Sequence, residues 1–254
     1  MEVAVINYRG LAGATLTSPR MFNAYSWEDI IESMKQIHSK YALGKNRKIF
    51  AIGFSMGANI LGNVLGHLGA DETAHNLRID GACVIQAPIR MWIGCKPLFE
   101  SMGGFYNRRF GANIKALMLR HAEALNPACL EKLNKTVPQL FEQWTERQTT
   151  VMAIDEAITS KLYGFGNRED YYYKASCFHR IPTIRTPTIF INAMDDPIVS
   201  PNCIDYDVFR NSRYVALATT RYGGHLGYME SVRSQEMWII KPCIEFFKAL
   251  DCEK

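Results

Sequence analysis

The stretch Phe50-Ala-Ile-Gly-Phe-Ser-Met-Gly-Ala-Asn-Ile-Leu61 places a serine between two glycines, directly after a short apolar run. Gly53-Phe-Ser-Met-Gly57 has the G-x-S-x-G pattern of a nucleophile elbow, a tight turn that presents a serine between a buried strand and a helix. The pattern also arises by chance, because glycine and serine are both common residues. The flanking sequence therefore decides whether Ser55 is a nucleophile or part of an ordinary glycine-rich turn.

The residues on both sides of Ser55 fit the strand and the helix of such an elbow. Lys48-Ile-Phe-Ala-Ile-Gly53 predicts a short buried strand. Apolar residues at helical spacing follow the serine, namely Ala58, Ile60, Leu61, Val64, Leu65 and Leu68. A serine at positive φ crowds the positions two before and two after it, so Gly53 and Gly57 are predicted to leave the room that it needs.

The elements around the elbow alternate between strand and helix. Val3 to Asn7 and Ile79 to Ile85 predict strands, and Ser26 offers an N-cap for a helix that ends near Tyr41. A final amphipathic helix is predicted from Ser234 to Leu250. Strands separated by helices pair in parallel, with the helices on the two faces of the sheet. The predicted fold class is therefore α/β, with a doubly wound and mostly parallel sheet.

The strand pattern disappears between residues 88 and 176. This segment predicts helices from Arg108 to Leu125 and from Pro127 to Thr150, inserted after a strand of the sheet. Long inserts beside active sites often act as lids, and we prefer this interpretation to one in which the helices only enlarge the core. We expect a single domain, in which 1–87 and 177–254 form the sheet core and 88–176 form a helical lid insertion.

The sheet pattern returns after the insertion, and each returning strand ends in residues that a serine nucleophile needs. Pro187 to Asn192 is followed by Asp195 and Asp196, and Tyr214 to Ala218 is followed by His225 in a glycine-rich loop. A serine hydroxyl is a poor nucleophile unless a base removes its proton, and the base needs a carboxylate to fix its tautomer. Because the carboxyl ends of parallel strands meet at one edge of a sheet, we expect a Ser-Asp-His triad there.

The choice between the two aspartates stays open at this point. Asp196 is preferred as the orienting acid because it adjoins Pro197, and Asp195 is the alternative. Either one also fits an ordinary turn before the proline. The other histidines lie in predicted helices or loops where packing explains them: His38, His67, His75, His121 and His179.

Composition and charge exclude several classes of function. The net charge of +4 and the isoelectric point near 8.6 are mild, and no run of lysine or arginine accompanies them, so nucleic acid is not an expected partner. The seven cysteines include no C-x-x-C pair, which favours a reducing compartment over a disulfide framework or a metal site. The chain contains no signal peptide or membrane-spanning segment, so we expect a cytoplasmic or membrane-associated protein without a metal or organic cofactor.

Five groups of residues follow one another in the same order as the motifs of a known family. They are Asn7-Tyr-Arg-Gly10 with Leu16-Thr-Ser-Pro-Arg-Met-Phe22; Gly53-Phe-Ser-Met-Gly-Ala-Asn-Ile-Leu61; Ile154-Asp-Glu156 with Tyr163-Gly-Phe165 and Asp170-Tyr-Tyr172; Ile189-Phe-Ile-Asn-Ala193 with Asp195-Asp-Pro197; and Gly223-Gly-His-Leu-Gly227. With these stretches the chain resembles the branch of the α/β-hydrolase superfamily that includes animal α/β-hydrolase-domain-containing proteins one and three, fungal medium-chain ester synthase/esterases and bacterial relatives. The resemblance implies an α/β-hydrolase fold, whose triad has the chain order Ser, Asp, His.

The resemblance also implies roles for individual residues. Ser55 is then the nucleophile, His225 the general base and Asp196 the orienting acid, while the backbone N–H of Met56 supplies one donor of the oxyanion hole. It implies hydrolysis of carboxylic esters without a cofactor, with short- and medium-chain esters, monoacylglycerols or phospholipids as substrates. A small-molecule ester or lipid is the expected partner, and a membrane surface is a second candidate partner.

One part of the family's pattern has no counterpart in these 254 residues. In the family, a strand ending in a His-Gly loop precedes the strand that opens this chain and supplies the second oxyanion donor. We therefore expect the first strands of the sheet to be missing, as in an N-terminally truncated hydrolase. The missing donor motivates one alternative to an esterase, a catalytically silent module that binds lipid or a partner. The resemblance to the fungal relatives implies another, an acyltransferase that moves acyl groups from acyl-CoA to an alcohol.

Overall fold

The computed structural model describes residues 2–42, 44, 47–71, 77–231, 233 and 236–252. Its centre is a sheet of four parallel strands that pair in the order β1-β2-β3-β4. The strands are β1 Phe50–Phe54, β2 Gly81–Ile85, β3 Thr188–Ala193 and β4 Val215–Thr220. Each begins and ends within two residues of a strand that the sequence predicts, which confirms the parallel α/β pattern in this part of the chain.

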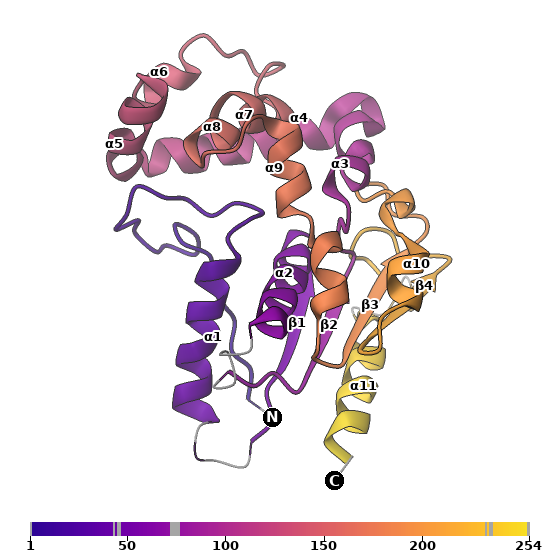
Figure 1. Cartoon of the computed structure of the whole chain (residues 1–254). Helices are drawn as coiled ribbons and strands as arrows, with labels where there is room; N and C mark the ends of the chain where they lie inside the picture. The colour runs from indigo at the N-terminus through magenta and orange to yellow at the C-terminus, as the bar shows by residue number, and fades with distance from the viewer. Residues whose placement is uncertain are drawn as a thin grey trace.

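Helices connect the strands and cover both faces of the sheet (Figure 1). Those around the sheet are α1 Trp27–Tyr41, α2 Met56–Ala70, the 3₁₀ helix Cys177–Thr183, the 3₁₀ turn Pro201–Cys203, α10 Tyr206–Arg210 and α11 Ile240–Cys252. Those between β2 and β3 are α3 Met91–Gly94, α4 Lys96–Arg120, α5 Ala122–Leu133, α6 Val137–Phe141, α7 Val151–Ile154, the π-helical turn Asp155–Thr159, α8 Ser160–Leu162 and α9 Arg168–Ala175. We call this second group the helical cap. No helix in the described part of the chain is long and apolar enough to cross a membrane.

The alternation of side chains along β2 explains why both faces of the sheet are covered. Ala82 and Val84 pack in the cluster formed with α2, whereas Cys83 and Ile85 pack in the cluster formed with α11. All four are fully buried, as expected for a central parallel strand with helices on both sides. Figure 1 shows α1 and α2 on one side of the sheet, α11 on the other, and the helical cap beyond one end of the strands.

The predicted strand from Val3 to Asn7 is wrong. The segment has no regular secondary structure, and in the described sheet β1 pairs with β2 alone. Val3 and Val5 are 77% and 79% exposed, while Ile6 and Tyr8 pack against α1 and α2. A strand forms where a neighbouring strand completes its hydrogen bonds, and β-branched composition by itself does not supply that neighbour.

The bounds of the cap helices differ from those that the sequence predicts. α4 is interrupted at 101–104, where Met102, Gly103 and Gly104 have positive φ, so its part after the break begins close to the predicted Arg108. It ends at Arg120 rather than at Leu125, because His121 leaves the helical backbone with φ −106° and ψ 23°. α5 ends where Asn134 takes the left-handed conformation with a φ of 53°, so the second predicted helix does not continue to Thr150. The final helix is confirmed as α11, but it begins at Ile240, and the predicted first residue Ser234 lies outside the described residues.

A buried carboxyl group connects two parts of the cap. Asp155 lies in the π-helical turn and accepts a 2.8 Å hydrogen bond from the Tyr172 hydroxyl on α9. Burial raises the pKa of Asp155 to about 6, and hydrogen bonds from Tyr172 and Thr159 oppose this rise only in part. The folded protein therefore binds a proton at this carboxyl more tightly than an aspartate with the ordinary pKa of 3.8 does.

Replacing Asp155 by Asn should remove the resulting pH dependence. Between pH 3.8 and about 6 the folded wild type retains a proton that the unfolded chain has released, so its stability falls as the pH rises through this window. The amide of Asp155→Asn carries no charge and still offers an oxygen to Tyr172. At neutral pH the variant should therefore melt at a higher temperature than wild type, and the difference should disappear below the window.

Thermal denaturation followed by circular dichroism at pH values below, within and above the window measures this difference. Asp207→Asn, at an exposed carboxyl on α10, is the control. Equal melting temperatures of Asp155→Asn and wild type at every pH would contradict the prediction.

Candidate active site

Ser55 stands between β1 and α2 in a backbone conformation that few residues adopt. Its φ of 54° and ψ of −122° lie outside the regions that residues with a Cβ ordinarily occupy. Hydrogen bonds hold the turn on both sides: Ser55 N donates to Ile85 O at 2.9 Å, and Ser55 O accepts from Ala58 N at 3.0 Å. The turn places the hydroxyl at the carboxyl end of the sheet. Strained backbone of this kind is common at functional sites.

The two glycines of the elbow have different neighbours. A Cβ on Gly53 would lie 2.6 Å from Gly57 O and 2.8 Å from Ala58 Cα, and both are backbone atoms with little freedom to move. A Cβ on Gly57 would lie 3.1 Å from the Tyr8 hydroxyl, which is the end of a side chain. Space is therefore tighter at Gly53 than at Gly57.

Three side chains from distant parts of the sequence form one hydrogen-bonded chain. His225 Nε2 lies 2.8 Å from Ser55 Oγ, and His225 Nδ1 lies 2.8 Å from Asp196 Oδ2. The three residues follow β1, β3 and β4, whose parallel pairing brings their carboxyl ends to the same edge of the sheet. The His225 side chain is 17% exposed and that of Asp196 only 1%, so the carboxylate is enclosed and the serine end is the more open one.

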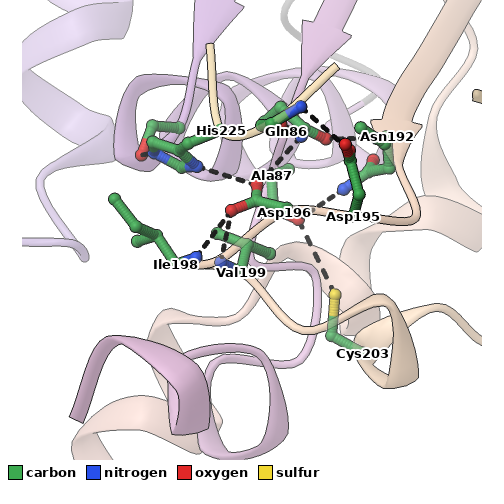
Figure 2. A network of polar contacts seen from close by, with 12 residues as sticks. Gln86, Ala87, Asn192, Asp195, Asp196, Ile198, Val199, Cys203 and His225 are labelled. Carbon is green, nitrogen blue, oxygen red and sulfur yellow. Dashed lines mark hydrogen bonds and ion pairs between the residues drawn. The ribbon is translucent and has the colours of Figure 1, made fainter. Parts of the chain in front are cut away.

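The structure distinguishes the two neighbouring aspartates. Asp196 Oδ1 accepts hydrogen bonds from the backbone N–H groups of Ile198 and Val199, at 2.7 and 2.9 Å. Its other oxygen, Oδ2, faces the histidine (Figure 2). Asp195 Oδ1 instead accepts a 2.9 Å hydrogen bond from Gly224 N, in the loop that precedes the histidine. Asp196 is thus the carboxylate that contacts the imidazole, and Asp195 holds the backbone of the histidine loop.

Sequence reasoning missed Gln86, the residue directly after β2. Its side chain is fully buried, and its amide donates to Asp196 Oδ2 at 2.9 Å and to Gly224 O at 2.6 Å. The sequence does contain a signal, because a polar residue follows an apolar strand at the sheet edge where the functional groups of parallel sheets collect. The same rule that selected the residues after β3 and β4 would have selected this one.

Met56 connects the site to the helical cap. It is the first residue of α2, so its backbone N–H is one of the four that have no carbonyl partner inside the helix. Its side chain packs with the cap cluster that contains Tyr171, Phe165 and Phe99. The residue after Ser55 therefore has a backbone donor that its own helix does not use and a side chain that packs against an apolar cluster of the cap.

Two tyrosines beside the site are uncharged. Burial raises the pKa of Tyr8, whose hydroxyl approaches the elbow at Gly57. Burial also raises the pKa of Tyr228 to about 12, and the nearby Asp196 adds to this. Both phenols therefore keep their protons at neutral pH and add no charge to the site.

Other histidines have structural contacts of their own. The His67 ring stacks on Trp27 with 3.6 Å between ring centroids, and His121 Nε2 lies 2.8 Å from Gly10 O. His75 lies outside the described residues. Across the ranges that the structure describes, no group of three His, Cys, Asp or Glu side chains is placed to hold a metal ion.

Comparisons with known sequences agree on one superfamily. A family model described as the alpha/beta hydrolase fold matches residues 2–232. A monoacylglycerol lipase of Saccharomyces cerevisiae is 30% identical over 249 residues, which are 97% of this chain and 52% of the lipase. The medium-chain fatty acid ethyl ester synthase/esterase 2 of the same yeast is 28% identical over 265 residues, covering 98% of this chain and 56% of the relative. The chain thus spans about half the length of the curated relatives that it matches.

A solved structure has a similar fold. A serine hydrolase from the bacterium Cycloclasticus zankles aligns with a TM-score of 0.52 at 14% identity, covering 98% of this chain and 79% of the other. At this identity the likeness concerns the fold alone. Since the family model covers most of the chain, and the parallel sheet has the strand, turn and helix around Ser55 that this fold requires, the chain belongs to the α/β-hydrolase fold family.

Proposed function

We propose that this chain carries the catalytic triad of a serine hydrolase that cleaves carboxylic esters of lipids. Ser55 is the nucleophile, His225 the general base and Asp196 the acid that orients the histidine. The observation that carries this proposal is the hydrogen-bonded chain from Asp196 through His225 to Ser55, with 2.8 Å at each link. Geometry of this kind, rather than position in the sequence, is what defines a triad.

The reaction follows from the order of these contacts. Ser55 Oγ attacks the ester carbonyl while His225 Nε2 takes the hydroxyl proton, and the imidazolium then donates this proton to the departing alcohol oxygen. A water molecule attacks the resulting acyl-enzyme, His225 accepts one of its protons, and the acid leaves as Ser55 regains its hydrogen. Asp196 holds the proton on Nδ1 throughout, so that Nε2 is free to act as the base.

The Met56 N–H is the proposed donor for the oxyanion. Charge develops on the carbonyl oxygen during the attack, and N–H groups at a helix N-terminus stabilise negative charge. Met56 begins α2 and directly follows the nucleophile, which is the position of one oxyanion donor in a nucleophile elbow.

Features of the cap and one relative support a lipid ester as the substrate. The cap lies beyond the carboxyl ends of the strands (Figure 1), and Met56 packs against a cluster that includes the cap residues Tyr171 and Tyr172. In this proposal the segment 88–176 is a lid that encloses an acyl chain. A relative is named monoacylglycerol lipase, which favours monoacylglycerols among the candidate substrates, beside short- and medium-chain esters and phospholipids.

The cellular setting in this proposal is a reducing one. All seven cysteines are free thiols in the structure, and six of them are buried. Free thiols persist where the glutathione pool is reducing. We therefore place the reaction in the cytoplasm or at a membrane surface that faces it, where lipid esters are available.

Acyl transfer is a second candidate, favoured by the relative named ethyl ester synthase/esterase. The acyl-enzyme is common to both reactions, and an alcohol in place of water would give a new ester. Adding ethanol to the assay and identifying the products by mass spectrometry separates them. Free fatty acid alone favours hydrolysis, and ethyl ester favours transfer.

Ser55→Ala should abolish covalent labelling by a fluorophosphonate probe, and ester hydrolysis with it, because it removes the attacking oxygen. Intact-mass spectrometry of the purified chain should show one probe per wild-type molecule and none on the variant. Ser33→Ala, at a serine on α1 that bonds its own helix, is the matched control. Labelling of Ser55→Ala at the wild-type level would refute the nucleophile, and a folded wild type that stays unlabelled would favour the silent module.

Substitution of the two aspartates by asparagine should give unequal results. Asp196→Asn should lower the labelling rate by about 10³- to 10⁴-fold, because an amide does not hold the imidazole in the required tautomer. Asp195→Asn keeps an oxygen that can accept from Gly224 N, so its rate should stay within a few-fold of wild type. A larger loss at Asp195 than at Asp196 would reverse the assignment of the acid.

The elbow glycines should also differ. Gly53→Ala places a methyl group against backbone, so it should lower the free energy of unfolding by about 2 kcal/mol or more and suppress labelling. Gly57→Ala meets only the Tyr8 hydroxyl, so it should have the smaller effect, and adding Tyr8→Phe should relieve it. Urea denaturation and labelling of all variants test this, and equal losses at both glycines would disprove it.

A further inference from the structure

Gln86 occupies the turn after β2 in a conformation that glutamine rarely adopts. Its φ is 53°, in the left-handed region, and its side chain is fully buried. The backbone N–H still donates to Ile191 O at 2.8 Å, which continues the pairing of β2 with β3 up to this residue. Beyond it, the side chain crosses the end of the sheet and lies among the loops that carry Asp196 and His225 (Figure 2).

The oxygen and both N–H groups of the Gln86 amide have partners. Oε1 accepts from Ala193 N at 2.7 Å, and Nε2 donates to Asp196 Oδ2 and to Gly224 O. These partners fix the orientation of the amide, because a flipped amide would point its oxygen at two acceptors. One side chain thus joins the ends of β2 and β3 to the histidine loop.

The residue before His225 is held from both sides. Gly224 O accepts from Gln86 Nε2 at 2.6 Å, and Gly224 N donates to Asp195 Oδ1 at 2.9 Å. The two peptide groups that flank the Gly224 Cα are therefore anchored to the ends of two other strands. This anchoring sets the point from which the imidazole reaches toward Ser55.

Gln86 also acts on the charge of the carboxylate. Asp196 Oδ2 accepts hydrogen bonds from both His225 Nδ1 and Gln86 Nε2. A neutral donor stabilises the negative charge without adding charge of its own, whereas a glutamate of the same shape would add a second carboxylate. With glutamine at this position, the carboxylate that contacts the imidazole has a neutral donor beside it rather than a second carboxylate.

From this geometry we propose that Gln86 is a positioning residue for the triad. It holds Asp196 and Gly224 where they bring His225 within hydrogen-bonding distance of Ser55. The inference rests on the proposed function, because the triad needs this placement only if it reacts. Gln86 itself bonds to the acid and to the histidine loop, not to the reacting oxygen.

Three variants of the purified chain separate this role from a general contribution to stability. Gln86→Met keeps the length of the side chain and removes its donors, and Gln86→Glu keeps the shape and adds a charge. Asn63→Leu is the matched control, because the Asn63 amide is also buried and donates to two backbone carbonyls. Each variant is assayed for the rate of fluorophosphonate labelling across pH, and the His225 ring is titrated by NMR.

The expected changes are specific to the triad. Gln86→Met should lower the maximal labelling rate by roughly 10- to 100-fold, the effect of moving a reacting group by about 1 Å. Gln86→Glu should move the acid limb of the rate profile and the His225 titration midpoint to higher pH by about one unit, because a second carboxylate favours the protonated ring. Asn63→Leu should lower the melting temperature and leave both the rate profile and the midpoint at their wild-type values.

The proposal would be overturned if both Gln86 variants kept the wild-type labelling rate and the wild-type His225 titration midpoint. It would also be overturned if Asn63→Leu changed the labelling rate and the midpoint as much as the Gln86 variants do. The NMR titration keeps this result separate from a failure of the proposed function. An unlabelled wild type whose His225 midpoint still moves in Gln86→Glu would contradict the esterase and support the positioning role. If Gln86→Met does not fold, Gln86→Leu, a side chain of similar volume that also lacks the donors, carries the rate test.

Discussion

The parallel pairing of the four strands is the constraint on which the candidate site depends. The register sets Ile85 beside both Phe54 and Ile191, and Ala193 beside Thr220, so the strands end along one edge of the sheet. Residues that follow these ends meet there, even though Ser55 and His225 are 170 positions apart in the chain. A slip of one residue in any pair would turn the buried side chains to the wrong face, and the hydrophobic clusters on both sides prevent it.

The backbone is strained at two of these strand ends. Ser55 and Gln86 directly follow β1 and β2, and both have left-handed φ values, 54° and 53°. Such conformations cost on the order of 1–3 kcal/mol each and persist where the surroundings compensate. Here the compensation comes from the neighbouring strand in each case, through Ser55 N to Ile85 O and Gln86 N to Ile191 O. The same strand pairing that aligns the ends therefore also maintains their strain.

The local sequence pattern predicts strands that are buried between helices well. It predicts poorly those segments whose structure depends on whether a neighbouring strand is present. All four strands of the sheet were predicted from short apolar runs, because parallel strands buried on both faces have that pattern. The run Val3 to Asn7 has the same composition but no strand beside it in the described sheet, and it lies largely exposed. In the cap, helix ends depend on single residues such as Asn134, which is exposed and takes the left-handed conformation that asparagine tolerates at the end of a helix.

The sequence by itself determined the fold class and predicted a candidate Ser-Asp-His triad, because period, turn chemistry and chain order are local properties. Only the tertiary structure decided which of two adjacent aspartates contacts His225, since neighbours in the chain point in different directions and each finds its own donor. The sequence marks Gln86 only as a polar residue at the end of a strand, and the tertiary structure shows its hydrogen bonds to residues 110 and 138 positions away. Hydrogen bonds between strand ends depend on register in three dimensions, and no pattern along a single strand encodes them.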